Sequence, residues 1–544
     1  MTAADTTDAS PRQTGPQPDP DSQPQPQPHL QRKPRRRHHL LWLGLIAIIG
    51  LAVVILYPLL TRTEPVTYSD PVEHFKYGSI GSEPVSGIPY AIWKALPLMF
   101  ADKLPPGSQA DYSAFGLLYE PGKDLPIGTS VRKVMGIDRV WLNCSVCHVG
   151  TVRNEPGAER QLLIGAPSNN LRLFDFVQFM RAAAIDNRWD PDYVLAKIDE
   201  AGVELGFIQR LLYRFLVIQQ VRDGLLTLDE QLDFLDRQEQ LGHDWGPGRV
   251  DTFNPYKKIQ FNYAMDRIPD AELTGAADYP SIWMQRPRQG MNLHWDGNNA
   301  SVEERNLSAS LGAGVTPATI DMASLERIRD WLWELPAPAF PAERIDREQA
   351  AAGAPLYAQY CAACHGAPKA DGSGYDYDRS RYPRLGEVES LAAIRTDPGR
   401  WRSYTQAFAG DQNMLYAGYP RPADGCAERL CSARFTHFKK TDGYANHPLD
   451  GIWARSPYLH NGSVPTLRAL LDPAVERPVT FYRGSDVFDW EEVGYRTEPP
   501  ADGPSLLFDT RVPGNANSGH EGPEYGTDLS AAEKDAIVEY MKTF

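Results

Sequence analysis

The chain has 544 residues, of which 42% are hydrophobic, so it can bury more than one core and most of it should fold. Its formal net charge of −15 argues against a nucleic-acid partner for the folded part, because a phosphate backbone needs a basic surface. The 46 prolines and 44 glycines exceed average usage and predict a loop-rich protein.

The N-terminal region predicts a tail followed by a membrane anchor. Residues 1–39 are expected to be a disordered cytoplasmic tail, rich in Pro and Gln and ending in a cluster of arginines. Residues 40–60 carry no charge, and about 20 apolar residues suffice to span a bilayer core. Because the positive flank precedes this stretch, everything after residue 62 should lie outside the cytoplasm. A cleaved signal peptide is the alternative, but its apolar core would run only about 7–15 residues before a small-residue cleavage site, which residues 57–63 lack.

Two copies of one motif occur in separate halves of the chain, Cys144-Ser-Val-Cys147-His148 and Cys361-Ala-Ala-Cys364-His365. The C-x-x-C-H pattern is the attachment pattern of c-type haem. Two thiols with two residues between them can add across the vinyl groups of a porphyrin, and the imidazole of the next residue then lies beneath the iron. The sequence therefore predicts two covalently bound haem c groups, with His148 and His365 as proximal iron ligands.

Other interpretations of the two motifs are weaker. A redox C-x-x-C pair needs no histidine, and a zinc site would need four ligands where each motif supplies three. A chance C-x-x-C-H in a chain of this size is roughly a one-in-a-thousand event. The remaining cysteines, Cys426 and Cys431, predict a local disulfide, because thiols outside the cytoplasm are normally oxidised. Two free thiols are the alternative.

The motifs divide the chain into two predicted haem domains, an N-terminal domain at 63–335 and a C-terminal cytochrome c domain at 346–544. A stiff, proline-rich connection at 335–342 separates them. Just before it, residues 322–333 have apolar side chains at helical spacing.

The C-terminal domain carries the pattern of two bounding helices, at 347–360 and 529–541. Ser530 and Glu533 form a capping box at the start of the second helix. The predicted fold class is mainly α with many loops, with two cytochrome c-like haem domains preceded by a single transmembrane helix.

With these motifs placed, the chain resembles the bacterial di-haem cytochrome c peroxidase superfamily, and within it the rubber-oxygenase-like di-haem c-type cytochromes. The resemblance covers roughly residues 70–544 and depends on the haem motifs and on three stretches: Leu293-His294-Trp295-Asp296-Gly297-Asn298, Trp453 to Leu467 around His460, and Gly514 to His520 with the helix that follows. In this superfamily a tryptophan lies between the two haems, which implies Trp295 as the inter-haem relay. Plain core packing is the alternative for Trp295.

Two departures from the superfamily matter. Its peroxidases carry a Glu-Met pair after the W-D-G segment, and that Glu assists O–O cleavage. Here Arg305 and the residues after it contain no carboxylate, and the nearest are Glu303 and Glu304, just before it. The second haem of those enzymes also takes a methionine after the P-Y-x-H stretch, which this chain lacks.

The remaining iron ligands have several candidates. For the haem on His365 we expect His520 as the sixth ligand, ahead of His460 and then Met414. The alternative for each is a loop residue that hydrogen-bonds a haem propionate or the backbone. A His/His pair would lower the reduction potential relative to His/Met.

The haem on His148 should keep one face open if it performs chemistry. His294, beside Trp295, is the residue expected near that face, and an ordinary structural histidine is the alternative. His74, His243, His437 and His447 are assigned as surface or structural residues.

The sequence supports two functions. The first is an oxidoreductase in which electrons pass between the two haems and the N-terminal haem reacts with O2 or peroxide. The second is a non-catalytic di-haem electron carrier. The acidic surface suits a small redox partner protein such as a cytochrome or cupredoxin. Together with the predicted anchor, the resemblance implies a single-pass protein of the bacterial inner membrane, with a cytoplasmic N-terminus and periplasmic haem domains.

Overall fold

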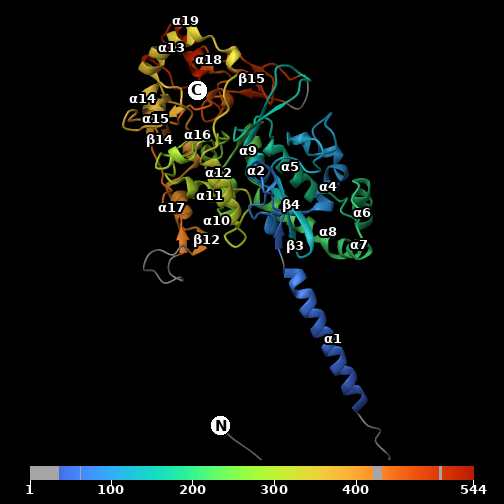
Figure 1. Cartoon of the computed structure of the whole chain (residues 1–544). Coiled ribbons are helices and arrows are strands. Elements are labelled where there is room, and N and C mark those ends of the chain that lie inside the picture. The colour runs from blue at the N-terminus through green and yellow to red at the C-terminus, as the bar shows by residue number, and fades with distance from the viewer. Residues whose placement is uncertain (1–35, 62, 421–431, 501–504) are drawn as a thin grey trace, which may run out of the picture. The chain divides into compact units, whose positions relative to one another are not determined.

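The computed structural model describes residues 36–61, 63–420, 432–500 and 505–544, apart from some side chains of the first helix and those of residues 416–420 and 432–433 (Figure 1). The chain divides into two units, Met1–Leu59 and Leu60–Phe544. The predicted disulfide between Cys426 and Cys431 lies outside the described residues, as does most of the predicted disordered tail.

The first unit contains most of helix α1 (Arg36–Thr61), which covers the predicted anchor at 40–60. A helix that crosses a bilayer needs about 20 consecutive apolar residues. Within the described ranges, no helix is long and apolar enough to cross a membrane. This finding contradicts the predicted transmembrane anchor and, with it, the predicted inner-membrane location with periplasmic haem domains.

The second unit combines helices with many short strands, so the expectation of a mainly α fold is wrong. One four-stranded sheet and seven two-stranded sheets occur among the described residues. The longest strands have six residues and many have two. Strands this short do not show the run of alternating apolar and polar residues by which a sequence reveals a sheet.

The four-stranded sheet leads to the first C-x-x-C-H motif. Its antiparallel strands lie in the order β1 (Thr63–Pro65), β3 (Thr129–Val134), β4 (Ile137–Leu142) and β2 (Ile88–Pro89). A two-residue turn joins β3 to β4, and its residues Met135 and Gly136 have φ of 51° and 78°. Positive φ at both positions is the geometry of the type I′ hairpin turn. Strand β4 ends at Leu142, so the hairpin places Asn143 and then Cys144 at its end.

Eleven α-helices in the described part of the second unit precede the proline-rich connection. They are α2 (Pro71–Tyr77), α3 (Glu83–Ser86), α4 (Tyr90–Met99), α5 (Leu173–Ala184), α6 (Pro191–Glu200), α7 (Phe207–Leu212), α8 (Ile218–Gln231), α9 (Leu235–Gln240), α10 (Asn254–Phe261), α11 (Val302–Gly312) and α12 (Met322–Leu332). The last of these confirms the helix predicted at 322–333. Trp93 on α4 is fully buried and stacks on Tyr112 with ring centroids 4.2 Å apart, at the centre of one hydrophobic cluster.

After the connection come α13 (Arg347–Tyr360), α14 (Ala362–His365), α15 (Leu391–Ile394), α16 (Gly399–Ser403), α17 (Gln406–Met414), α18 (Leu467–Leu470) and α19 (Ala531–Met541). The two-stranded sheets pair β5 (Val149–Val152) with β6 (Gln161–Ile164), β7 (Arg249–Val250) with β8 (Ala277–Asp278), β9 (Ala367–Pro368) with β10 (Tyr375–Asp376), β11 (Val388–Ser390) with β14 (Gly443–Ala445), β12 (Tyr416–Pro420) with β13 (Ser432–Arg434), β15 (Thr480–Arg483) with β18 (Leu506–Asp509), and β16 (Phe488–Asp489) with β17 (Gly494–Tyr495).

Helices α13 and α19 are the two predicted bounding helices, and they cross in close contact. A Cβ on Gly353 of α13 would lie 1.9 Å from the backbone oxygen of Ala536 on α19, so only glycine permits this approach. The predicted capping box is present, with the Ser530 hydroxyl accepting from the Glu533 amide and the Glu533 carboxylate accepting from the Ser530 amide. The crossing holds the segment that ends in the second C-x-x-C-H motif.

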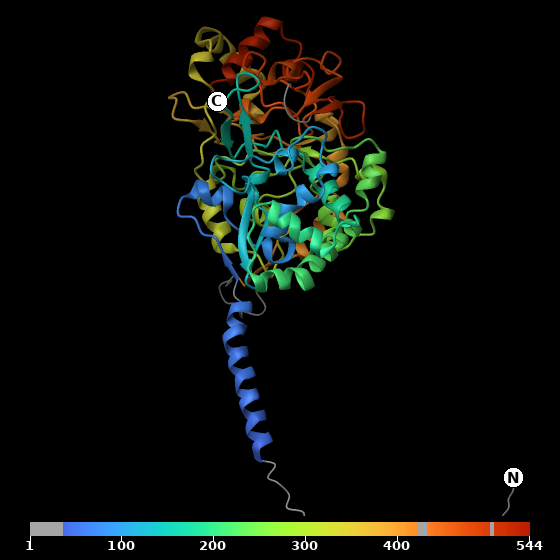
Figure 2. The same ribbon diagram turned by 90° about the vertical axis from the view of Figure 1, so that its right-hand side faces the viewer.

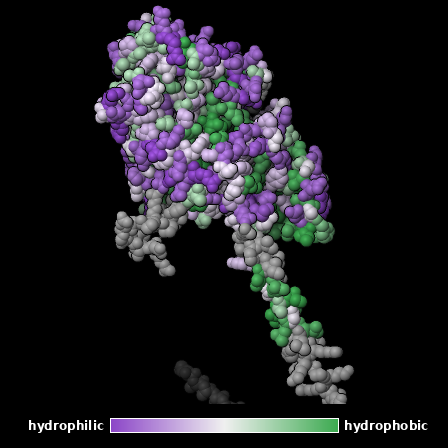
Figure 3. All heavy atoms as spheres, in the orientation of Figure 1, coloured by the Kyte–Doolittle hydropathy of each residue, from purple (hydrophilic) through white to green (hydrophobic). Residues whose placement is uncertain are grey.

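The segments before and after the proline-rich connection share their hydrophobic cores. One cluster joins Val152 and Trp283 to Tyr357, Trp453 and Ile537. Both ribbon views show the two segments packed together in the second unit (Figures 1 and 2). Apolar side chains also gather on the surface around α7, where Phe207 and Ile208 are exposed (Figure 3).

Candidate haem sites

The second C-x-x-C-H motif lies at the end of helix α13. Cys361 caps this helix, and α14 carries the chain through Cys364 to His365. Two tyrosines fix the turn: Tyr357 donates a hydrogen bond to the Gly366 carbonyl (2.8 Å) and Tyr375 donates to the His365 carbonyl (2.6 Å). Both thiols and the imidazole therefore occupy one short, firmly held turn, as attachment of one porphyrin requires.

The ring of His365 is oriented by a backbone carbonyl. Its Nδ1 lies 2.7 Å from the His447 oxygen, which can only accept, so Nδ1 carries the proton. Nε2 is then left unprotonated, which is the state a metal ligand needs. Burial also lowers the pKa of His365, which keeps the ring neutral.

The ring of His520 lies beside that of His365. The two ring centroids are 6.2 Å apart. The two imidazoles could together hold a haem iron, which would supply redox chemistry at this site. The main chain fixes His520 at φ 48°, with its amide donating to the Ile394 carbonyl (2.8 Å). Burial, and then the neighbouring His365, lower the pKa of His520 to about 3.

The other two candidates for this position lie in different surroundings. His460 is buried and stacks on Tyr444, with centroids 4.1 Å apart, and its carbonyl accepts from the Asp278 amide. Burial lowers its pKa, helped by Arg400 and Arg249 rather than by His365. Met414 is 64% exposed at the end of α17. The geometry therefore favours His520 as the partner of His365.

The first C-x-x-C-H motif lies in a turn between two strands. Cys144 begins a 3₁₀ turn after β4, and the chain enters β5 directly after His148. The side chain of Asn143 accepts from the Ser145 amide (3.0 Å) and so caps the turn. Gly128 packs under it with φ 90°, where a Cβ would lie 2.4 Å from the Cα of Val146. Cys144, Cys147 and His148 are thus brought together without a preceding helix.

A buried arginine lies in the electrostatic surroundings of His148. Burial, and then Arg305, lower the pKa of His148 to about 4, so the ring is neutral and able to ligate iron. Arg305 is 8% exposed, hydrogen-bonds Asn306, and forms no ion pair within the described residues. A buried guanidinium without a carboxylate partner fits a haem propionate. Tyr279 lies against the thiol of Cys147.

His294 and Trp295 lie together near Arg305. His294 has φ 61°, and its Nδ1 lies 2.5 Å from the side-chain oxygen of Asn298. Burial, followed by Arg400, lowers its pKa to about 4. The indole of Trp295 donates to the Asp278 carbonyl (2.7 Å). Both side chains are held in single orientations by the backbone and by short hydrogen bonds.

Glu304, one of the two carboxylates directly before Arg305 in the sequence, binds a loop. Its oxygens accept from the backbone amides of Thr436 and His437 (2.9 and 3.0 Å) and from the His437 ring (2.8 Å). These donors lower the pKa of Glu304 against its burial. This carboxylate is therefore unavailable for the role that the peroxidase glutamate has.

The sequence assigns no functional role to two residues of these sites. His447 is expected only to be a surface or structural residue, and the structure gives it contacts with both His365 and the His294 segment. Arg305 is expected only as part of a segment without carboxylates. No motif signals either residue, because each acts through contacts between distant parts of the chain.

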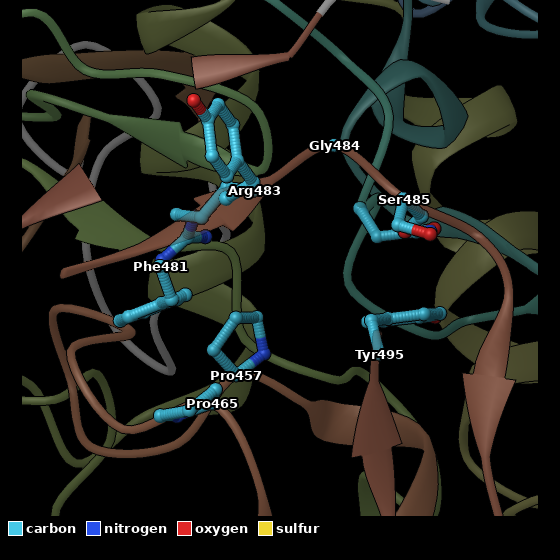
Figure 4. A pocket seen from close by; sticks show the side chains of 9 residues that line it. Pro457, Pro465, Phe481, Arg483, Gly484, Ser485 and Tyr495 are labelled. Carbon is cyan, nitrogen blue, oxygen red and sulfur yellow. The ribbon is translucent and has the colours of Figure 1, made fainter. Parts of the chain in front are cut away.

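A small pocket lies apart from the predicted iron ligands, none of which lines it. Pro457, Pro465, Phe481 and Arg483 form one side of it in Figure 4, and Tyr495 and Ser485 the other. Arg483 is already paired with Asp278 (2.7 Å). The pocket therefore belongs to the packing between the two segments.

Comparison with known proteins supports the haem assignment. Residues 443–482 match a family described as RoxA-like, cytochrome c-like, and residues 348–413 match cytochrome c oxidase, cbb3-type, subunit III. These matches confirm the resemblance to the rubber-oxygenase-like di-haem cytochromes c. The chain carries cytochrome c domains with covalently bound haem c, and its function includes haem-based electron transfer.

Two curated proteins of Sinorhizobium fredii are similar in sequence, and both are uncharacterized. The protein y4iM is 33% identical over 294 residues, which are 49% of this chain and 64% of that protein, less than two thirds of its length. The protein y4iJ is 27% identical over 525 residues, which are 81% of this chain and 85% of that protein.

Proposed function

We propose that this chain is a di-haem oxidoreductase, with one covalent haem c on each C-x-x-C-H turn, electron transfer between them, and O2 or peroxide chemistry on the His148 side. One asymmetry carries the proposal. His365 faces His520 at 6.2 Å, whereas no second imidazole in the described part of the chain faces His148 in this way. A haem with two protein ligands relays electrons, and one with an open face can also bind an external ligand.

The haem iron would supply the redox chemistry, and the protein supplies the surroundings. The Asn298 amide nitrogen donates to Asp296 (2.9 Å), so its oxygen faces His294 and the proton of His294 lies on Nδ1. Nε2 of His294 is then a proton acceptor. We place it on the open side of His148, where Arg305 provides positive charge.

Trp295 is the proposed relay between the two haem sites. Its indole is anchored to Asp278, next to Tyr279, which contacts Cys147. The net charge of −15 supports a small basic redox partner, a cytochrome or a cupredoxin, as the source or acceptor of electrons.

Spectroscopy of the purified full chain tests this proposal. We expect a haem content of two per chain, one low-spin signal, and a second signal that shifts when CO is added to the reduced protein. His148→Ala should abolish the CO shift and leave the low-spin signal. Two low-spin signals without any response to CO, O2 or peroxide would refute the enzyme proposal.

The second candidate is a non-catalytic electron carrier, favoured by the position of Glu304. Its carboxylate binds the loop at Thr436 and His437 and cannot assist O–O cleavage. A non-catalytic carrier requires a sixth protein ligand for the haem on His148 as well as for the haem on His365. The same spectra therefore separate the two functions.

A further inference from the structure

A continuous set of hydrogen bonds leads from His365 to the segment of His294. The Nδ1 of His365 donates to the backbone oxygen of His447 (2.7 Å). The Nε2 of His447 lies 3.0 Å from the backbone oxygen of His294. A carbonyl can only accept, so the Nε2 of His447 carries the proton. His447 thus accepts with its backbone and donates with its ring.

The ring of His447 also contacts Trp295. The two rings are perpendicular, with an interplanar angle of 86° and centroids 5.7 Å apart. This edge-to-face arrangement is the favoured one for aromatic pairs. Trp295 is fixed from two other sides, since its indole donates to Asp278 and its carbonyl accepts from the Ala445 amide (2.9 Å). The ring of His447 is thus a further contact of the indole.

The path continues from Trp295 to the first motif. Asp278, which accepts from the indole, is bonded in sequence to Tyr279, and Tyr279 contacts the thiol of Cys147. Every step from His365 to Cys147 is therefore a covalent bond, a hydrogen bond or a ring contact. Electrons tunnel faster through such contacts than through open space.

We propose that His447 is a positioning residue that couples the two haem sites. Its backbone carbonyl orients the ring of His365, and its own ring holds Trp295 in place. The inference rests on the proposed two-haem function. One electron moves from the reduced haem on one motif to the oxidised haem on the other, and no bond is broken. The carbonyl of His447 makes His365 a stronger electron donor to iron, which lowers the reduction potential of that haem.

His447→Leu and His447→Gln test the proposal. Leucine fills the space but removes the ring N–H that donates to the His294 carbonyl. The main chain of residue 447, whose carbonyl orients His365, is then no longer fixed to the His294 segment, and Trp295 loses its ring contact. Glutamine retains an N–H donor without the aromatic ring. The matched control is His437→Leu, because His437 is exposed and bonds Glu304 rather than either haem site.

Two measurements on the full chain with both haems decide the outcome. We expect His447→Leu to raise the midpoint potential of the low-spin haem and to slow electron transfer between the haems at least tenfold, measured by flash photolysis of the half-reduced protein. Glutamine should keep the potential near that of the unaltered chain and recover only part of the rate. A His447→Leu chain that matches His437→Leu in both measurements would overturn the inference.

These readouts are separate from the proposed function. A protein whose haems bind no CO, O2 or peroxide would lose the enzyme assignment, yet its potential and its inter-haem rate would still respond to His447. Should His447→Leu lower the yield of folded protein, the glutamine variant still tests the ring contact with Trp295, because an inter-haem rate equal to that of the unaltered chain would overturn the inference.

Discussion

The two C-x-x-C-H turns have the same residue pattern but are held in different ways. The turn at Cys361 ends helix α13, which is locked against α19 through Gly353. The turn at Cys144 lies between strands β4 and β5 and is held by Asn143 and by the close approach of Gly128. The motif itself therefore needs only a short turn. The surrounding fold decides which side chains lie beside each turn.

The two turns also differ in their similarity to known proteins and in the residues around them. Both family matches fall in the segment that carries the Cys361 turn. That segment has the opposing His520, whereas the Cys144 turn has the buried cation Arg305 and the His294 segment close by. One unit thus contains a turn with a second histidine nearby and a turn with a buried cation nearby.

Removal of the attachment cysteines is the strongest test of this asymmetry. Cys361→Ala with Cys364→Ala should reduce the haem content from two to one per chain and remove the low-spin signal. Cys144→Ala with Cys147→Ala should also leave one haem but remove the response to CO. Pyridine haemochrome absorbance and EPR measure both effects. Equivalent spectra from the two double variants would contradict the asymmetry.

His520→Ala removes the imidazole that distinguishes the Cys361 turn from the Cys144 turn. Without an imidazole opposite His365, the low-spin signal should become high-spin and the reduced haem on this motif should also bind CO. EPR and absorbance spectra of the oxidised and reduced protein measure the change. His460→Ala is the control, since His460 stacks on Tyr444 and its pKa responds to arginines rather than to His365. A low-spin signal that disappears with His460 and survives the loss of His520 would exchange their roles.

Gly353→Ala tests the helix crossing that supports the Cys361 turn. The added Cβ would lie 1.9 Å from the backbone oxygen of Ala536, and backbone cannot move aside cheaply. We expect a loss of about 1–3 kcal/mol in the free energy of unfolding, measured in denaturant. Gly410→Ala in α17 is the control: open space surrounds it, and the change should stabilise by about 0.4–1 kcal/mol. Equal effects at both glycines would show that the crossing is not close.

Local chemistry in this chain could be predicted from sequence, and long-range contacts could not. The haem motifs, α12, α13, α19 and the Ser530 capping box all follow from residues within a few positions of one another. The short strands were missed because two residues carry no periodicity.

The predicted anchor at 40–60 is wrong for a different reason. The prediction rests on composition alone, and the described helices include none that is long and apolar enough to cross a membrane. The structural surroundings of His447 and Arg305 involve residues far away in sequence, such as His365 and His148. A single sequence carries no signal for such pairs. From the sequence His520 is one of three candidate ligands, and its distance to His365 is known only from the structure.

His243 offers a smaller, pH-dependent test of whether the two segments unfold together. It is fully buried, its Nε2 accepts from the Ala276 amide (3.2 Å), and its ring lies against Gly514 of the C-terminal segment. Burial, followed by Arg249, lowers its pKa to about 3. The unfolded chain binds this proton near pH 6.5, so the stability that neutral His243 contributes is complete above pH 6.5 and is lost as the pH falls toward 3.

We therefore expect the free energy of unfolding to fall by about 1.4 kcal/mol per pH unit below pH 6 from this residue alone. His243→Gln keeps an acceptor for the Ala276 amide but cannot be protonated, so the difference in stability between the variant and the unaltered chain should shrink as the pH falls. Unfolding followed at the absorbance of each haem measures it. If the two segments unfold as one unit, His243→Gln changes both transitions equally, and a change confined to one haem would show that the segments unfold separately.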